Sequence, residues 1–282
     1  MFAATAAGHR TVRHRRLQNL PLRQLRNLLL IVMTALLVGQ SIVAPAPAAY
    51  ADVGDFTSAT WNMRGSTSEG ESKWTTEVHA LAQEFDVVAL QEVGQVPSRA
   101  EETLHFPSWG GTVREYLWRQ GDREPPVWIY YLRVDGHTNL ALVTRHRADF
   151  ATALPPPGGP RGVLGIELES YGHRNLFFTA HADSPHGEDA DDLVQAVINW
   201  VGQEAPGASW EILADWNREP GTWEPPGADS EIINPDRPTY INLDTGRELE
   251  IDYMVTNSFA ILVAIVITNI LSDHYAVCFR RR

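Results

Sequence analysis

The segment that best indicates the fold class is residues 210–220, which read WEILADWNREP. A short apolar run suited to a buried strand is followed directly by Asp215 and Asn217, and Pro220 lies in the loop beyond them. In layered α/β folds, the loops at strand ends carry most ligand-binding side chains. The segment therefore predicts a strand that delivers polar residues to a functional pocket.

The same arrangement recurs at several other apolar runs. Asn62 follows the run 56–61, Glu92 follows the run 87–90, and His181 follows the run 176–179. The pair Asp273-His274 stands directly before the run 275–279. Because strand ends from distant parts of a chain can meet at one pocket, we expect these polar residues to converge.

Apolar periodicity predicts many strands and few helices within residues 52–282. The predicted strands are residues 56–61, 87–90, 127–134, 140–143, 163–168, 176–179, 210–214, 251–255, 259–267 and 275–279. Helical spacing appears in residues 72–85 and 189–201, and proline- and glycine-rich residues 154–162 and 219–227 are predicted loops. With no internal linker, this pattern predicts one α/β domain built around stacked sheets.

The first 51 residues differ in kind from the rest of the chain. Six arginines and no acidic residue are combined there with an apolar run at residues 28–38, and the segment ends in Ala49-Tyr50-Ala51. Small residues at those positions are what a signal peptidase reads. We therefore expect a signal peptide at residues 1–51, cleaved after Ala51, and a secreted catalytic domain at residues 52–282.

The apolar run of the leader, about a dozen residues long, falls short of the roughly 20 that a transmembrane helix needs. We therefore expect no stable membrane span in the mature chain. The paired arginines Arg15-Arg16 leave both the general and the twin-arginine export routes open.

The mature chain is expected to be strongly acidic, with 17 basic residues against 35 acidic residues. Such a net charge repels DNA, so binding of nucleic acid would depend on a local basic patch and bound cations. The only cysteine, Cys278, excludes an internal disulfide, so stability has to come from the core.

The residues at the strand ends suit metal-assisted phosphoryl chemistry. Glu92 and Asp273 offer hard oxygen ligands for Mg²⁺, Mn²⁺ or Ca²⁺, whereas one cysteine and no paired histidines on a helix disfavour zinc. His181 and His274 can exchange protons near neutral pH, and Asp252 is placed to hold one imidazole in a fixed tautomer. Each residue alone also fits a structural or solvated role, and only their combination predicts an active site.

Six motifs, in this order, resemble the endonuclease/exonuclease/phosphatase family, which is also called deoxyribonuclease I-like. They are WNMRG at 61–65, LQE at 90–92, TAH at 179–181, ADWNREP at 214–220, IDY at 251–253 and SDH at 272–274. Residues 71–74 and 155–166 further resemble the active subunits of cytolethal distending toxins. The resemblance implies a four-layer α/β sandwich with two mixed, mainly antiparallel β-sheets flanked by helices.

The resemblance also implies a ligand set for metal and phosphate. Glu92 and Asp273, with Asn62 beside them, would bind the metal ion. Arg161, Asn217 and Asn62 would contact the substrate phosphate.

The catalytic roles implied by the resemblance fall to a second group of residues. His274 paired with Asp252 would form one catalytic unit, and His181 would be the second catalytic histidine. Asp215 and Asn217 would position the attacking water and the phosphate.

The implied function is a secreted, Mg²⁺-dependent DNA endonuclease that serves as the active subunit of a toxin with separate receptor-binding subunits. The same groups would serve a phosphoinositide phosphatase, and the acidic surface favours this alternative. One departure concerns the toxins' Asn-Asp-Ala, which reads Glu188-Asp189-Ala190 here. That change is expected to place negative charge near the phosphate site and to weaken DNA binding or shift substrate preference.

Overall fold

Two β-sheets form the centre of the computed structural model, which describes residues 52–65, 73–121, 124–134, 138–155, 161–268 and 271–282. The predicted signal peptide, residues 1–51, lies outside the described residues, so its cleavage stays a prediction. Residues 156–160 of the predicted loop 154–162 and residue 72 of the predicted helix 72–85 also lie outside the described residues. Within the described residues, the helices are too short or too polar to traverse a bilayer.

The larger sheet has eight strands in the order β15-β16-β1-β2-β6-β5-β4-β3. Its strands are β1 (Ser58–Asn62), β2 (Val87–Val93), β3 (Glu101–Ser108), β4 (Gly111–Trp118), β5 (Val127–Leu132), β6 (Asn139–Thr144), β15 (Leu262–Ile267) and β16 (Ala276–Arg281). β1 and β2 run parallel, and the other neighbours are antiparallel. Since β1 and β2 are in register up to Asn62 and Gln91, their carboxyl ends lie side by side.

The smaller sheet has six strands in the order β11-β14-β10-β9-β8-β7. Its strands are β7 (Phe150–Leu154), β8 (Val163–Ser170), β9 (His173–His181), β10 (Ser209–Asp215), β11 (Glu231–Ile233) and β14 (Asp252–Thr256). Only β9 and β10 run parallel. The register places Asp215 between His181 on one side and Asp252 on the other.

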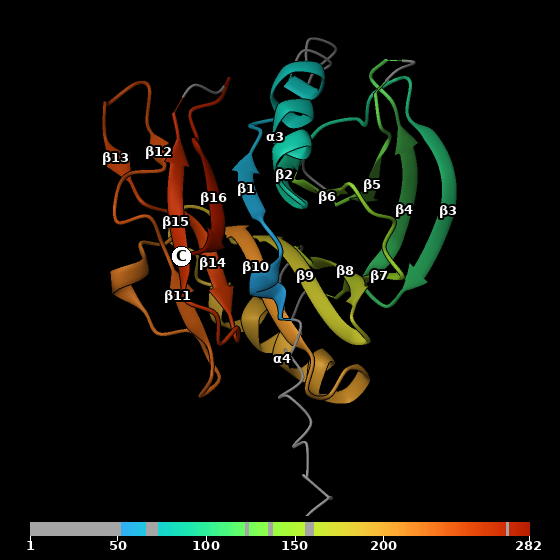
Figure 1. The fold of residues 1–282 in the computed structure, drawn as a ribbon. Helices are drawn as coiled ribbons and strands as arrows, with labels where there is room; N and C mark the ends of the chain where they lie inside the picture. The colour runs from blue at the N-terminus through green and yellow to red at the C-terminus, as the bar shows by residue number, and fades with distance from the viewer. Residues whose placement is uncertain (1–51, 66–72, 122–123, 135–137, 156–160, 269–270) are drawn as a thin grey trace, which may run out of the picture. The chain divides into compact units, whose positions relative to one another are not determined.

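Helices cover the outer face of each sheet (Figure 1). The π-helical turn η3 (Trp74–Val78) continues into α3 (His79–Glu84) beside β1 and β2, while α4 (Ala190–Glu204) lies beside β9 and β10. The buried face of α4 consists of Ala190, Leu193, Val194, Val197 and Val201. The spacing of these apolar residues matches the helical period, so the apolar stripe packs on the sheet while the opposite, polar face of α4 faces solvent.

Three clusters of buried side chains correspond to the three interfaces between these layers. On β10, Ile212 belongs to the cluster that contains α4, whereas the next residue, Leu213, belongs to the cluster between the two sheets. On β2, Ala89 lies between the sheets and Leu90 packs with α3. Because successive strand residues point to opposite faces, the central strands of both sheets are buried on both sides. The four-layer sandwich with two mixed sheets is therefore confirmed.

A short hairpin, β12 (Tyr240–Ile241) and β13 (Glu248–Leu249), stands outside both sheets. The backbone N–H of Ile241 donates to the carbonyl of Asp273 at 2.9 Å, and the N–H of Tyr275 donates to the carbonyl of Thr239 at 2.6 Å. These bonds attach the hairpin to the segment that carries Asp273 and His274.

The predicted strands and helices are present, with boundaries that differ by a few residues. β3, β4, β7, β11, β12 and β13 were not predicted. β3 is exposed over most of its length, so its sequence carries no one-sided apolar pattern, and β11, β12 and β13 have only two or three residues each. Leu154, which was predicted to begin a loop, is the last residue of β7.

Candidate active site

Asp215 lies at the centre of the candidate site, at the carboxyl end of β10. Its Oδ2 accepts a hydrogen bond from Asn62 Nδ2 at 2.8 Å, which connects the two sheets. The same oxygen lies 3.5 Å from His181 Nε2 and 3.8 Å from His274 Nε2. The carboxylate is buried, so these contacts are little screened by solvent. One carboxylate thus faces both candidate catalytic histidines.

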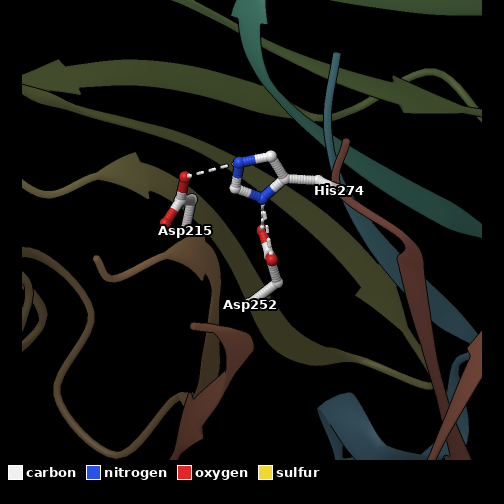
Figure 2. Close-up of side chains that lie close together, drawn as sticks. All are labelled: Asp215, Asp252 and His274. Atoms are coloured by element: carbon white, nitrogen blue, oxygen red, sulfur yellow. Dashed lines mark hydrogen bonds and ion pairs between the residues drawn. The ribbon is translucent and has the colours of Figure 1, made fainter. Parts of the chain in front are cut away.

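His274 lies between two carboxylates (Figure 2). Its Nδ1 is 2.9 Å from Asp252 Oδ2, and its Nε2 faces Asp215. Burial alone lowers the pKa of His274, but the charges of Asp252 and Asp215 outweigh that effect and raise the pKa to about 9. Burial also raises the pKa of Asp252, with the charge of His274 opposing it. At neutral pH the pair is therefore an imidazolium bonded to a carboxylate.

Thr239 is a second hydrogen-bond partner of the Asp252 carboxylate, in addition to His274. Its hydroxyl donates to Asp252 Oδ2 at 2.8 Å and accepts the backbone N–H groups of Ile251 and Asp252, each at 3.0 Å. Thr239 is fully buried. No pattern around Thr239 in the sequence distinguishes it, because its partner lies 13 positions further along the chain.

His181 has a different environment at the end of β9. Its Nδ1 is buried without a hydrogen-bond partner among the described residues, and its Nε2 lies 3.8 Å from Glu92 Oε1. Burial lowers the pKa of His181 below its ordinary value, and the nearby Asp215 charge does not compensate. His181 is therefore neutral at neutral pH, whereas His274 is charged.

Glu92 is turned toward the site by an irregularity in β2. The register between β2 and β6 shifts between Leu90 and Val93, and Glu92 adopts a φ of 50°. A bulge of this kind redirects a side chain, and a positive φ at a non-glycine residue costs free energy that the surrounding contacts must supply. Asn62 Nδ2 donates to Glu92 Oε1 at 3.2 Å, so Glu92 is held near Asp215.

Asp273 faces the same cleft from the loop before β16. Its Oδ2 lies 3.1 Å from Arg64 Nη1. Ser272 Oγ donates to the carbonyl of Asn62 at 3.0 Å, which fixes this loop against the end of β1. Asn62 Oδ1 accepts the N–H of Arg64 at 2.8 Å, so metal ligation by Asn62 through that oxygen would require the amide to turn over.

The predicted phosphate contacts, Asn217 and Arg161, are both held by the loop after β9. Asn217 donates from Nδ2 to the carbonyl of Ala182 at 3.0 Å, and its N–H donates to Asp215 Oδ1 at 2.9 Å. Arg161 Nη1 donates to the carbonyls of His181 and Ala182, and its Nε lies 3.2 Å from Asp183 Oδ1. Arg161 therefore already has an acidic partner.

The Glu188-Asp189 pair does not line the cleft. The Asp189 carboxylate accepts the N–H of Asp183 at 2.6 Å within the same loop. Asp183 is the acidic residue of this loop that forms an ion pair with Arg161. The expected effect of Glu188 and Asp189 on DNA binding stays a prediction.

These residues surround one cleft of about 540 Å³, which is within the usual size range of ligand sites. The predicted residues that line it are Glu92, Arg161, His181, Asp215, Asn217, Asp273 and His274. Asn62 and Asp252 lie directly behind the lining as hydrogen-bond partners of Asp215 and His274. The structure thus brings every predicted site residue together, while the role of each remains a prediction.

The cleft also contains residues that the sequence did not indicate. Arg64 and Arg247 add positive charge, and Tyr240 packs its ring against His274 with ring centres 4.7 Å apart. Arg64 is part of the WNMRG motif, so its neighbours offered a signal. Arg247 and Tyr240 lie in a hairpin too short to produce a sequence pattern.

The donor atoms around the cleft suit a hard divalent cation. Asp215, Asp252 and His274 bring three potential ligand atoms within 4.8 Å of one another and could hold a metal ion. Glu92 and Asp273 add two carboxylates to the lining. Carboxylate oxygens are the ligands that Mg²⁺, Mn²⁺ and Ca²⁺ prefer. The residues present therefore fit the metal that the sequence led us to expect, and they leave its identity open.

Comparison with known proteins defines the class. Residues 59–274 match the endonuclease/exonuclease/phosphatase family, and the chain belongs to this family. Members of the family are metal-dependent. The chain is accordingly a deoxyribonuclease I-like enzyme of the phosphodiesterase type.

Individual relatives narrow this class to toxin subunits. The chain is 38% identical over 263 residues to a cytolethal distending toxin subunit of Escherichia coli, and the match covers 83% of this chain and 94% of that protein. A Salmonella typhi homologue of the same toxin subunit is 32% identical, with coverage of 83% and 92%. The solved structure of CdtB, the biologically active subunit of cytolethal distending toxin, is 35% identical, with a TM-score of 0.71 and coverage of 82% and 99%. These relatives identify a deoxyribonuclease I-like toxin subunit.

Proposed function

We propose that the mature chain is a secreted, Mg²⁺-dependent DNA endonuclease and the active subunit of a genotoxin similar to cytolethal distending toxin. The observation that carries this proposal is the buried Asp215 carboxylate, which faces both His181 and His274 from distances of 3.5 and 3.8 Å. Hydrolysis of a phosphodiester requires one group that accepts a proton from water and one that donates a proton to the leaving oxygen. Two histidines in different protonation states beside one carboxylate can supply these two groups.

The protonation states assign the proton transfers. Asp215 and Asn217 orient a water molecule toward the phosphorus, and neutral His181 accepts the water's proton at Nε2. The oxygen of that water forms a bond to phosphorus while the bond from phosphorus to the leaving oxygen breaks. His274, charged and fixed by Asp252, donates its Nε2 proton to the leaving oxygen.

Glu92 and Asp273 are the residues that would hold the metal ion. When bound, Mg²⁺ supplies Lewis-acid polarisation of the phosphoryl oxygens and neutralises charge on the phosphate. We assign the ion to Glu92 and Asp273 because Asp252 is already bonded to His274 Nδ1 and to the Thr239 hydroxyl. Asn62 positions Glu92 through its amide.

A plasmid assay tests this function. Purified protein of residues 52–282 should nick supercoiled plasmid with Mg²⁺, excess EDTA should abolish nicking, and His181→Ala should lose it. His146→Ala is the matched control, because His146 is exposed and does not line the cleft. Nicking that survives excess EDTA, or full activity of His181→Ala, would contradict the mechanism.

The second candidate is a phosphoinositide phosphatase that uses the same residues. The observation in its favour is that Arg64, Arg161 and Arg247 all line a cleft in an otherwise acidic chain, as recognition of a headgroup with several phosphates would require. Phosphate release from inositol-lipid headgroups should be compared with plasmid nicking by the same preparation. The faster reaction, at matched enzyme concentration, identifies the substrate class.

Delivery and export complete the proposal. The relatives are described as subunits of a toxin, which supports separate receptor-binding subunits as partners of this chain. Affinity capture of the secreted protein from its native source should recover two such subunits. Amino-terminal sequencing of the same material should begin at Asp52 if the signal peptide is cleaved after Ala51.

A further inference from the structure

Among the described residues, three arginines line the cleft, and they differ in their acidic partners. Arg64 lies 3.1 Å from Asp273, and Arg161 lies 3.2 Å from Asp183. Arg247 is exposed, and within the described part of the chain its guanidinium forms no ion pair. Arg247 therefore offers this cleft a positive charge that is not already neutralised.

The turn that carries Arg247 is well organised by hydrogen bonds. Asn242 Oδ1 accepts the N–H groups of Asp244 at 3.1 Å and Thr245 at 2.9 Å. The backbone of Asn242 donates to the carbonyl of Arg247 and accepts the N–H of Gly246, both at 2.8 Å. Gly246 has a φ of 69°, a conformation that glycine adopts without strain. The backbone at Arg247 is thus held before any ligand binds.

The same hairpin is attached to the segment that carries Asp273 and His274. Ile241 donates its N–H to the carbonyl of Asp273, Tyr275 donates to Thr239, and Tyr240 packs on the His274 ring. The position of the hairpin relative to His274 is therefore set by backbone bonds as well as by side-chain packing. Arg247 lines the same cleft as Asp215 and His274.

We propose that Arg247 binds a second phosphate of the substrate, next to the phosphate that is hydrolysed. This inference rests on the proposed function and specifies the substrate class of the site: a phosphate ester that carries at least two phosphates. Glu92, Asp215 and Asp273 repel an additional phosphate, so binding it needs a positive charge that has no acidic partner. A guanidinium can contact phosphate through two parallel hydrogen bonds. A nucleic-acid strand and a polyphosphorylated inositol headgroup both present such a second phosphate.

The test compares substrates with one phosphate and with several. Arg247→Ala, Arg247→Lys and the control Arg119→Ala should be assayed on supercoiled plasmid, on a polyphosphorylated inositol lipid and on bis(4-nitrophenyl) phosphate. Arg119 is the matched control because it is exposed, forms no ion pair among the described residues and lies outside the cleft lining. Arg247→Ala should raise KM about tenfold on the multiply phosphorylated substrate. It should leave bis(4-nitrophenyl) phosphate hydrolysis unchanged, and Arg247→Lys should be intermediate.

Binding of a fluorescent oligonucleotide provides a readout that does not depend on turnover. Arg247→Ala should weaken binding and reduce the slope of log affinity against log salt by about 1. A rise in KM for plasmid nicking by Arg247→Ala identifies nucleic acid as the source of the second phosphate. A rise in KM confined to the inositol lipid identifies the headgroup. Equal losses on all substrates, or Arg247→Ala behaving as Arg119→Ala in both kinetics and binding, would overturn the inference. Absence of nicking by the wild-type protein would refute the proposed endonuclease while the binding and lipid measurements still decide the role of Arg247.

Discussion

His274 and His181 occupy matching positions in the cleft, and the structure gives them opposite protonation states. Both are nearly fully buried, and each has a ring nitrogen facing Asp215. His274 also has Asp252 bonded to its Nδ1, whereas His181 Nδ1 has no partner in the described part of the chain. Burial lowers the pKa of both rings, but at His274 the charge of Asp252, together with Asp215, outweighs burial, whereas at His181 the charge of Arg161 adds to it. In the proposed mechanism, the partner on the far ring nitrogen therefore determines which histidine donates a proton and which accepts one.

The largest expected effect on kcat comes from removing either of these two histidines. His274→Ala and His181→Ala should each lower kcat for plasmid nicking about 10³-fold, because each removes one proton transfer. Single-turnover kinetics will separate loss of chemistry from loss of binding. The double variant should be little worse than either single variant, since the two groups act in one reaction. Additive losses would contradict their joint role.

Removing the partner of His274 should make the two histidines alike. Asp252→Asn keeps the shape of the side chain and removes the charge, so the pKa of His274 should fall and kcat should drop about 10²-fold. Titration of the ring resonances by NMR measures the pKa directly. If His274 stays charged at neutral pH in this variant, then Asp252 is not what raises its pKa.

The pH profile should report both states in the wild-type enzyme. In the proposed mechanism, activity needs His274 protonated, so the alkaline limb of kcat should fall near the His274 pKa of about 9. Activity also needs His181 neutral, and because the pKa of His181 is lowered, the acid limb should lie below the ordinary histidine range. In Asp252→Asn the alkaline limb should move to lower pH, while His146→Ala should leave both limbs in place. An alkaline limb unchanged by Asp252→Asn would count against this assignment.

A smaller effect is expected one contact further from the reaction, at Thr239. Thr239→Val removes the hydroxyl that donates to Asp252, and we expect about a tenfold loss of kcat. Thr239 is a positioning residue, so the alkaline limb of the pH profile should also shift. Thr239→Ser restores the hydroxyl and should restore both the rate and the limb. A loss of thermal stability with an unaltered pH profile would indicate a structural role only.

Glu211 can be compared with Asp252, because both carboxylates are buried but only Asp252 has a histidine partner. Burial raises the pKa of Glu211 to about 8, above its ordinary 4.5. The folded protein therefore binds this proton more tightly than the unfolded chain, and the stability it contributes is fully present below pH 4.5 and is lost as pH rises toward 8. The loss amounts to about 1.4 kcal/mol per pH unit. Urea unfolding of Glu211→Gln should lack this decline between those limits, whereas an unchanged decline would exclude Glu211 as its source.

The accuracy of the sequence-based predictions depended on whether the relevant signal was local. Strands such as β10 have apolar faces that alternate or are continuous, and α4 has a clear helical stripe, so their existence could be read from neighbouring residues. The exposed β3 and the two-residue β12 and β13 gave no such signal. The site residues were predictable because each stands beside a strand end within a recognisable motif.

By itself, the sequence determined the layered class of the fold, the strand ends that carry polar residues and the chemical types available to the site. The tertiary structure decided how those residues act. Asn62 and Asp215 are 153 positions apart and still share a hydrogen bond, and the pKa of His274 depends on two carboxylates from different strands. Electrostatic interactions depend on distance in space and on burial, and neither can be read from neighbouring letters. For the same reason, Arg247 became a candidate only once its position in the cleft and its lack of an ion pair were known.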